Sequence, residues 1–353
     1  MSIRQKTYRL RGIITTALLI ALTACGHDSE PSGENIAETE TAGRNGIHNA
    51  QLTVRRDAQS KLEALCQSAP LIVTRKDDDS IVDLDLGLSL RQATGCPLGE
   101  RPRRQIIIDD SVTQIKLRSP IHLFSNTHIE GGEARPLVRY QGGGSVFYVD
   151  DRSDVRLTGL SITQGTGASN QSGDCISVRG NGQDILLENL HVYACNDGLI
   201  DITASRKTDR LSVTVRDSLL SDHDKAILIS GPSVDAELCS NPASINVYLE
   251  RLTFLRTGQR HPRVAGSVDV KLRDSIVSHE PFLRPDGSYG ASYGVIASQG
   301  ARVSVERTVF NATNLRGRKI AVERLVNDTH PCTELIYDAE GRPTGSAETG
   351  DIH

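Results

Sequence analysis

Val155-Arg-Leu157-Thr-Gly-Leu160 and Ile185-Leu-Leu187-Glu-Asn-Leu190 share the pattern that decides the fold, in which apolar residues alternate with other residues and a polar or small pair precedes the last position. Four further segments repeat the pattern at intervals of 23 to 34 residues, and they begin at Val213, Val247, Val270 and Val303. Alternation with a period of two predicts β-strands. Gly, Asn and Asp residues that follow the strands supply turns. The six segments therefore predict a series of short strands separated by turns.

The repeats also predict how the strands are assembled. No amphipathic helix of useful length lies between them, which excludes βαβ units. Self-similarity at this period without helices indicates a β-solenoid, in which each rung stacks on the previous one. From periodicity alone, a β-sandwich is the alternative. We expect an all-β parallel β-helix over residues 51–353, with short capping helices in an N-terminal cap at about 51–104 and a polar C-terminal tail from about 314.

Composition and charge narrow the class of protein. Of the 353 residues, 37% are hydrophobic and 31 are Gly, which is typical of a globular chain and excludes wholesale disorder. The chain has 40 basic and 44 acidic residues, and residues 1–24 hold four of the basic ones and no acid, so the remainder carries 36 − 44 = −8. An acidic protein of this kind is a poor candidate for nucleic-acid binding driven by bulk charge. We therefore expect no nucleic-acid partner.

The N-terminus has the pattern of an export signal. Four basic residues precede the apolar run 13–22, which is too short to span a bilayer stably. Leu22-Thr-Ala-Cys25 resembles a bacterial lipobox, so we expect a lipoprotein signal peptide at 1–24 and lipidation of Cys25. Gly26 follows in place of Asp, which favours the outer membrane or cell surface over inner-membrane retention. The polar residues of 25–50 predict a flexible tether. The alternative is an ordinary signal peptide and a secreted protein.

Six cysteines remain after Cys25, and an even number in an exported protein indicates disulfides. Six cysteines allow fifteen pairings, so the sequence alone leaves the connectivity open. The absence of a Cys-x-x-Cys motif argues against zinc and redox sites. We expect neighbours in the sequence to pair: Cys66 with Cys96, Cys175 with Cys195 and Cys239 with Cys332.

Three aspartates are candidate metal ligands. Alternation places Asp201 on the outward face of its strand, and Asp197 has the same parity. In a straight strand the two would lie about 13 Å apart, but Gly198 permits a bend that brings them together. Asp174 lies one rung earlier, at a rung spacing of about 4.8 Å. Three hard oxygen donors on neighbouring rungs suit Ca²⁺. The alternative is that these aspartates only form turns.

Five short segments of the chain follow one another in a recognisable order. They are Phe124-Ser-Asn126-Thr-His-Ile129-Glu-Gly131, Asp174-Cys-Ile-Ser-Val178, Asp197-Gly-Leu-Ile-Asp201-Ile202, Asp222-His-Asp-Lys225-Ala-Ile-Leu-Ile-Ser-Gly231 and Arg260-His-Pro262. In this order they resemble the pectate lyases of polysaccharide lyase family 1, over roughly residues 88–312. Each motif alone is weak evidence, and the order of all five is stronger. The fold of that family is a right-handed parallel β-helix, which agrees with the prediction from the repeats.

The resemblance implies a reaction and a role for each matched residue. It implies Asp174, Asp197 and Asp201 as calcium ligands, Lys225 as a contact for a substrate carboxylate and Arg260 as the base. The substrate would be de-esterified polygalacturonate, cleaved by β-elimination to 4,5-unsaturated oligogalacturonides. Calcium and Lys225 would stabilise the charge that develops on the substrate carboxylate. Because arginine holds its proton tightly, a base of this kind needs cationic neighbours, and an alkaline optimum is expected.

Two departures from the family pattern leave other functions open. Leu186-Leu-Glu-Asn189 stands where the family has Trp-Ile-Asp-His, and Ala265 replaces the last Arg of Arg-x-Pro-x-x-Arg, whereas Arg263 is expected to hold another uronate. These departures favour the alternative of a non-catalytic β-helix lipoprotein that binds acidic glycans or acts as an adhesin. A polygalacturonase-type hydrolase is disfavoured because no Asp-Asp pair with a following Gly-His-Gly is present. The partners we expect are an acidic polysaccharide and, through the lipid anchor, the outer membrane; the protein itself is expected to be a monomer.

Overall fold

A computed structural model describes the chain in nine ranges, which are 57–78, 87–165, 172–239, 243–278, 282–283, 287, 294–310, 323–324 and 330–337. The expected signal peptide, tether and lipidated Cys25 lie outside the described residues, as does most of the expected tail from 314. No helix within these ranges has the length and apolar character needed to cross a membrane.

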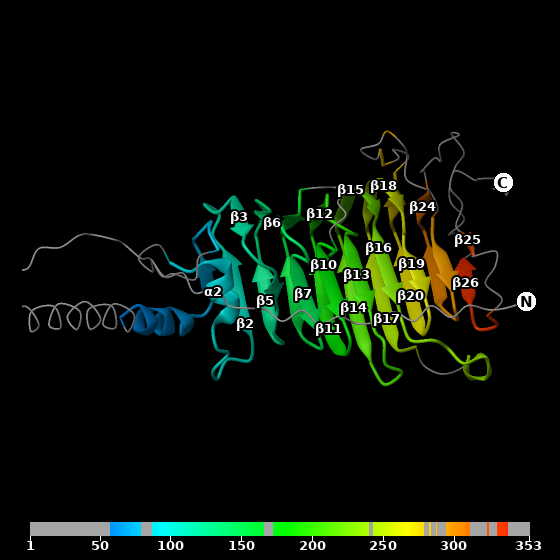
Figure 1. Ribbon diagram of the computed structural model, residues 1–353, viewed down its shortest axis with the longest axis horizontal. Coiled ribbons are helices and arrows are strands. Elements are labelled where there is room, and N and C mark those ends of the chain that lie inside the picture. The colour runs from blue at the N-terminus through cyan, green and yellow to red at the C-terminus, as the bar shows by residue number, and fades with distance from the viewer. Residues whose placement is uncertain are drawn as a thin grey trace, which may run out of the picture. The chain divides into compact units, whose positions relative to one another are not determined.

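Three parallel sheets form the body of the protein, and the chain visits them in turn. Along each sheet, neighbouring strands follow in chain order, as Figure 1 shows for the labelled strands from β2 to β26. Sheet A has ten strands: β1 (Leu71–Val73), β2 (Arg104–Ile108), β5 (Thr127–Glu130), β8 (Val155–Thr158), β11 (Gly182–Glu188), β14 (Leu211–Arg216), β17 (Ile245–Glu250), β20 (Val268–Arg273), β23 (Arg302–Glu306) and β26 (Glu334–Tyr337).

The other two sheets have eight strands each. Sheet B contains β3 (Gln114–Leu117), β6 (Leu137–Tyr140), β9 (Ser161–Thr163), β12 (His191–Tyr193), β15 (Leu219–Lys225), β18 (Thr253–Gln259), β21 (Ile276–Val277) and β24 (Val309–Phe310). Sheet C contains β4 (Ile121–His122), β7 (Phe147–Asp150), β10 (Ile176–Arg179), β13 (Ile200–Thr203), β16 (Ile227–Ser230), β19 (Arg263–Ala265), β22 (Ile296–Ser298) and β25 (Glu323–Arg324). This arrangement is a parallel β-helix, and the predicted fold class is confirmed.

The six repeat segments are six neighbouring strands of sheet A, aligned at their first apolar residue. The fifth residue of every repeat adopts a left-handed backbone conformation, with φ between 41° and 64°. Gly, Asn and Asp tolerate this conformation well, and it turns the chain from sheet A into sheet B. Two of the six positions are instead Arg, and both guanidinium groups form paired hydrogen bonds with an aspartate one rung earlier, Arg251 with Asp217 and Arg307 with Asp274.

The core is built from columns of stacked aliphatic and aromatic side chains. In sheet C, Phe147, Ile176, Ile200 and Ile227 occupy one register position on successive rungs and are fully buried. Burial of each such side chain contributes about 1.5–3 kcal/mol relative to exposure. Because side chains alternate along a strand, the next residue of each of these strands must face outward. Asp201 belongs to this outward column, and other residues of the candidate site lie where the chain enters these strands.

A short helical cap covers the first rung. Residues 57–66 are helical, and α2 (Leu90–Gly95) packs against β1 and β2. Ser89 and Gln92 form a reciprocal capping box at the start of α2, which satisfies two backbone N–H groups that the helix leaves free. A disulfide between Cys66 and Cys96 joins the two helical segments. The short capping helices expected from the sequence are therefore present.

The other two disulfides also pair as predicted, Cys175 with Cys195 and Cys239 with Cys332. Cys239 follows a short 3₁₀ helix, η2 (Ala236–Leu238). Within the stretch expected to be only a polar tail, β25 and β26 extend sheets C and A by one strand each. The solenoid thus continues further toward the C-terminus than the spacing of the repeats indicated.

Candidate functional site

Four of the predicted site residues lie where the chain enters successive strands of sheet C. Asp174 precedes β10, Asp197 precedes β13 and Arg260 precedes β19, whereas Lys225 is the last residue of β15 and is followed after one residue by β16. Backbone hydrogen bonds join these turns in order, from Cys175 N to Gly198 O (3.2 Å), from Leu199 N to Lys225 O (3.1 Å) and from Ile227 N to Arg260 O (2.8 Å). Residues that are 23 to 35 positions apart in the sequence therefore become neighbours on adjacent rungs.

Asp201 and Arg263 project from the strands themselves. On sheet C, Asp201 is in register with Ser177 on one side and Leu228 on the other, and Leu228 is in register with Arg263. Asp201 is thus outward, as the alternation predicted. Two rungs separate it from Arg263, which corresponds to about 10 Å.

Asp174 and Asp201 form a largely buried acidic pair. Asp174 is 3% exposed and the side chain of Asp201 is 17% exposed, and the Oδ1 atom of each aspartate is buried without a hydrogen-bond partner among the described residues. Burial and the neighbouring charges of Asp201 and Asp197 raise the pKa of Asp174 to about 8. Burial also raises the pKa of Asp201, to about 6, against the opposing charge of Arg260. Such orphaned carboxylate oxygens are costly unless a cation or a proton compensates them.

Asp197 is held differently, because Lys225 Nζ forms an ion pair with its Oδ1. Burial would raise the pKa of Asp197, but the hydrogen bond and charge of Lys225 outweigh it and lower the pKa. No set of three or more His, Cys, Asp or Glu side chains in the described ranges is arranged to hold a metal ion. The structure therefore brings Asp174 and Asp201 together and leaves Asp197 paired with Lys225.

Gly198 allows the Asp174 carboxylate to approach the turn that leads into β13. A Cβ atom at this position would lie 2.7 Å from Asp174 Oδ1 and 3.8 Å from Asp201 Oδ1. Its backbone is outside the left-handed region, so the bend expected at this glycine does not depend on a positive φ. The residue is required because a carboxylate approaches it closely.

Arg260 completes the cluster. Its Nη1 atom lies 4.0 Å from Asp201 Oδ1, its side chain is 15% exposed and its Nε is buried without a hydrogen-bond partner in the described part of the chain. Its backbone has φ 64°, an uncommon conformation for a bulky residue. The adjoining His261 is fully buried, bonds to Thr257 Oγ1 at 2.7 Å and packs edge-on against Phe254, which anchors this turn.

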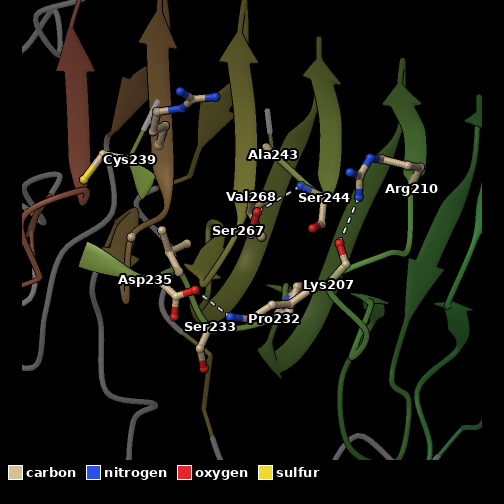
Figure 2. Close-up of a pocket in the computed structure, with 13 residues that line it drawn as sticks. Lys207, Arg210, Pro232, Ser233, Asp235, Cys239, Ala243, Ser244, Ser267 and Val268 are labelled. Atoms are coloured by element: carbon tan, nitrogen blue, oxygen red, sulfur yellow. Dashed lines mark hydrogen bonds and ion pairs between the residues drawn. The ribbon is translucent and has the colours of Figure 1, made fainter. Parts of the chain in front are cut away.

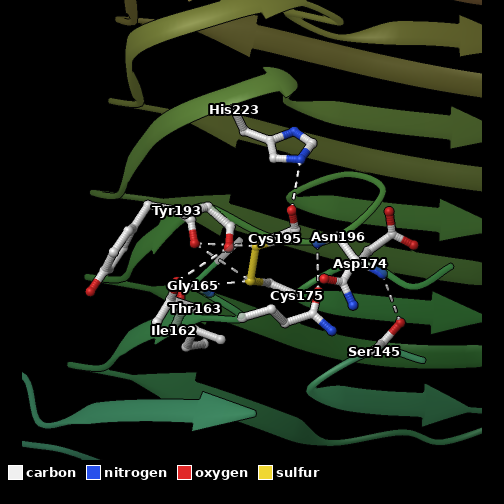
Figure 3. The surroundings of a disulfide bond; sticks show 12 residues. Ser145, Ile162, Thr163, Gly165, Asp174, Cys175, Tyr193, Cys195, Asn196 and His223 are labelled. Carbon is white, nitrogen blue, oxygen red and sulfur yellow. Dashed lines mark hydrogen bonds between the residues drawn. A yellow bond between two sulfur atoms is a disulfide. The ribbon is translucent and has the colours of Figure 1, made fainter. Parts of the chain in front are cut away.

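A disulfide and a histidine fix the turns behind the site. Cys175 and Cys195 are fully buried, and their bond joins the residue after Asp174 to the turn that carries Asp197 (Figure 3). His223 Nε2 lies 3.0 Å from Cys195 O, and its Nδ1 accepts a hydrogen bond from Lys225 N at 2.9 Å. Its role is structural, since both ring nitrogens are engaged with the backbone.

Two further residues of this surface carried no motif in the sequence. Arg179 is the last residue of β10, and its guanidinium lies 5.3 Å from the centre of the Tyr148 ring on β7. Its positive charge offsets a small part of the rise in the pKa values of Asp174 and Asp201, so it belongs to the electrostatic environment of the site. Strand parity is the signal that could have found it, because Arg179 shares the outward face of β10 with Ser177.

A separate cavity of about 360 Å³ lies beside the starts of β17, β20 and β23 (Figure 2). The charged side chains that line it already have partners. Lys207 Nζ bonds to Asp235 Oδ2 at 2.7 Å, and Arg210 Nη1 donates to the backbone oxygen of Lys207 at 3.0 Å. None of the predicted site residues lines this cavity.

Comparisons with models of known protein families and with curated proteins find no match for the chain. The likeness to pectate lyases therefore remains a prediction from short motifs. The two departures occupy ordinary positions in the β-helix. Leu187 is buried in sheet A between Leu157 and Val215, and Ala265 lies in register between Ser230 and Ser298.

Proposed function

We propose that the protein is a calcium-dependent lyase that cleaves de-esterified polygalacturonate, or a related acidic polysaccharide, by β-elimination. The observation that carries the proposal is the pair Asp174 and Asp201, each with a buried Oδ1 that has no hydrogen-bond partner among the described residues. Asp201 Oδ1 lies 4.0 Å from Arg260 Nη1, and Arg260 Nε is also buried without a hydrogen-bond partner there. Groups arranged at this cost are typical of functional sites.

The donor set fits calcium. Carboxylate oxygens are the ligands that Ca²⁺ prefers, and Asp174 Oδ1 and Asp201 Oδ1 have no hydrogen-bond partner among the described residues. Asp174 and Asp201 would hold the ion, with Asp197 joining them once Lys225 releases it, and with water and substrate oxygens as further ligands. A bound calcium would supply positive charge that stabilises the substrate carboxylate as negative charge builds on it.

The roles of the side chains follow from their positions. Arg260 would accept the proton from C5 of a uronate. The electron pair of the C5–H bond would form the C4–C5 double bond, the C4–O bond would break, and the departing oxygen would take a proton from water. Lys225, once exchanged from Asp197 to the substrate, would bind the reacting carboxylate, and Arg263 would hold a neighbouring uronate. Proton transfer by a positioned group contributes about a hundredfold or more.

A binder without catalysis is the second candidate, and Ala265 favours it because it removes a cation from the family pattern. In either case the protein would be an exported monomer, anchored to the outer membrane through Cys25 and without a nucleic-acid partner. The acidic chain and the lipobox-like segment support this location.

Release of unsaturated sugar tests the proposal. Purified protein with polygalacturonate and calcium should produce the ultraviolet absorbance of a 4,5-unsaturated product, and a chelator should stop it. Arg260→Lys should lower the rate by at least about a hundredfold and leave calcium-dependent binding of oligogalacturonate nearly unchanged. Arg256→Lys is the matched control, since Arg256 also has a left-handed backbone (φ 50°) but pairs with Asp222.

Three outcomes would contradict parts of this proposal. Wild-type protein that binds oligogalacturonate but releases no unsaturated sugar would be a binder. Full turnover by Arg260→Lys would refute the assigned base. Asp201→Asn should weaken calcium and substrate binding together, and unchanged calcium affinity in this variant would refute the metal site.

A further inference from the structure

Arg179 is an exposed cation held in a fixed position beside the candidate site. Its guanidinium lies over the Tyr148 ring, and that ring is itself stacked on His122 at 4.7 Å. The hydroxyl of Tyr148 accepts a hydrogen bond from Ser145 N at 2.9 Å, which fixes the ring. Within the described residues, Arg179 makes no ion pair, so its charge is available to a ligand.

A hollow of about 430 Å³ opens next to Arg179, at the carboxyl ends of β10, β13 and β16. Thr203 and Ser230 also line it. Convergent hydroxyls and one charged group are typical partners of a sugar that carries a carboxylate.

The charges along sheet C alternate in sign. Arg179 on β10 and Arg263 on β19 are separated by three rungs, about 14 Å along the stack, and Asp201 lies on one of the rungs between them. Arg179 is in register with Thr203, so it lies two residues further along the strand direction than the column of Asp201 and Arg263. A single sugar ring cannot reach both arginines. An oligomer of acidic sugars that lies along the sheet would meet a cation on the rung before Asp201 and another two rungs after it.

We propose that Arg179, supported by Tyr148, forms a subsite for a second carboxylate of the substrate, at the carboxyl end of β10 and one rung before Asp201. The inference rests on the proposed function and adds to it a requirement for at least three consecutive uronates. It also predicts how the affinities for the sugar and for calcium change when the charge of Arg179 is removed. A cation at this place attracts an anionic sugar but repels a calcium ion bound by Asp174 and Asp201, so removal of its charge must change the two affinities in opposite directions.

Calorimetry on the full exported chain tests the subsite with Arg179→Gln, which keeps most of the side-chain length and removes the charge. Trigalacturonate in the presence of calcium should bind about tenfold more weakly, the loss of one charge-assisted contact. Calcium alone should bind about threefold more tightly, as expected for a divalent and a monovalent charge about 10 Å apart in water. Arg179→Lys should keep the wild-type calcium affinity and lose part of the trigalacturonate affinity, because lysine lacks the planar fork.

Two controls separate this inference from its alternatives. Arg156→Gln removes a similarly exposed arginine from sheet A and should change neither affinity. Fully methyl-esterified trigalacturonate should not distinguish Arg179→Gln from wild type. Equal trigalacturonate affinity in Arg179→Gln and wild type, or a loss of both affinities together, would overturn the subsite alone. Wild-type protein that binds no oligogalacturonate would overturn the proposed function, and the subsite with it.

Discussion

Replacement of Gly198 by alanine should weaken the proposed calcium binding without damaging the fold. The new Cβ would lie 2.7 Å from Asp174 Oδ1, whereas ordinary contact begins at 3.4 Å, so the carboxylate must retreat by about 3.4 − 2.7 = 0.7 Å. The backbone of Gly198 is outside the left-handed region, so alanine adopts it without strain. Because the obstructing atom is at the end of a side chain, Asp174 can rotate away and the rung can remain intact.

The expected loss follows from that displacement. A ligand moved by most of an ångström from its working position costs about 1.4–2.8 kcal/mol, which is a ten- to hundredfold weaker calcium affinity. Isothermal titration with calcium measures the affinity, and thermal unfolding in chelator should show a change below about 1 kcal/mol.

Gly143→Ala is the matched control for this substitution. Gly143 also has a backbone outside the left-handed region, and its Cβ would meet nothing within 4 Å. Equal calcium affinities in the two alanine variants would refute the reasoning, because the contact with Asp174 would then have no bearing on a metal site.

Three other predictions follow from the same structure. Calcium affinity should rise between pH 6 and pH 8, by up to about tenfold per pH unit for each proton displaced. The pKa values of Asp201 (about 6) and Asp174 (about 8) are raised, so calcium must compete with protons below these values. A flat profile in calorimetry would contradict this. Joint replacement of Cys175 and Cys195 by serine should lower the free energy of unfolding by about 3 kcal/mol in denaturant titrations and weaken calcium binding, and unchanged calcium affinity would show that the disulfide does not position the aspartates. Gly131→Ala should destabilise the fold by about 2–4 kcal/mol, since its Cβ would lie 2.1 Å from a backbone oxygen of the next rung, and an unshifted unfolding midpoint would argue against this packing.

Sheet A was predictable in detail because its repeats contain both the strand and the turn that ends it. The apolar alternation gave the inward face, and the polar or small fifth residue marked the left-handed turn at Asn189 and Asp217. Arg251 and Arg307 were not predictable as turn residues, because arginine has no intrinsic preference for positive φ. Their conformation is supported by ion pairs to a neighbouring rung, which only the register of the stack creates.

The site was predictable only in part, because its contacts also depend on how the rungs stack on one another. Strand parity correctly placed Asp201 outward, but the pairing of Lys225 with Asp197 depends on how turns of unequal length stack on one another. The sequence also favoured Gly198 for a bend, whereas the structure requires it for the approach of Asp174. Contacts between rungs join residues about 30 positions apart, and no local pattern encodes them.

The bond between Cys239 and Cys332 encloses β17 through β25 in a covalent ring, and its two cysteines are 93 positions apart in the sequence. A protease that cuts the backbone anywhere inside this ring converts a closed loop into two chains that remain tethered by sulfur. In denaturing electrophoresis, such a cut molecule would migrate as one species until a reductant is added. Its last strands would stay at high local concentration beside the strands with which they pair, and could form those pairs again. The protein is expected outside the cell, where proteases act and the cell cannot replace a damaged chain in place. There, this disulfide would hold the two pieces of a chain together after a single cut.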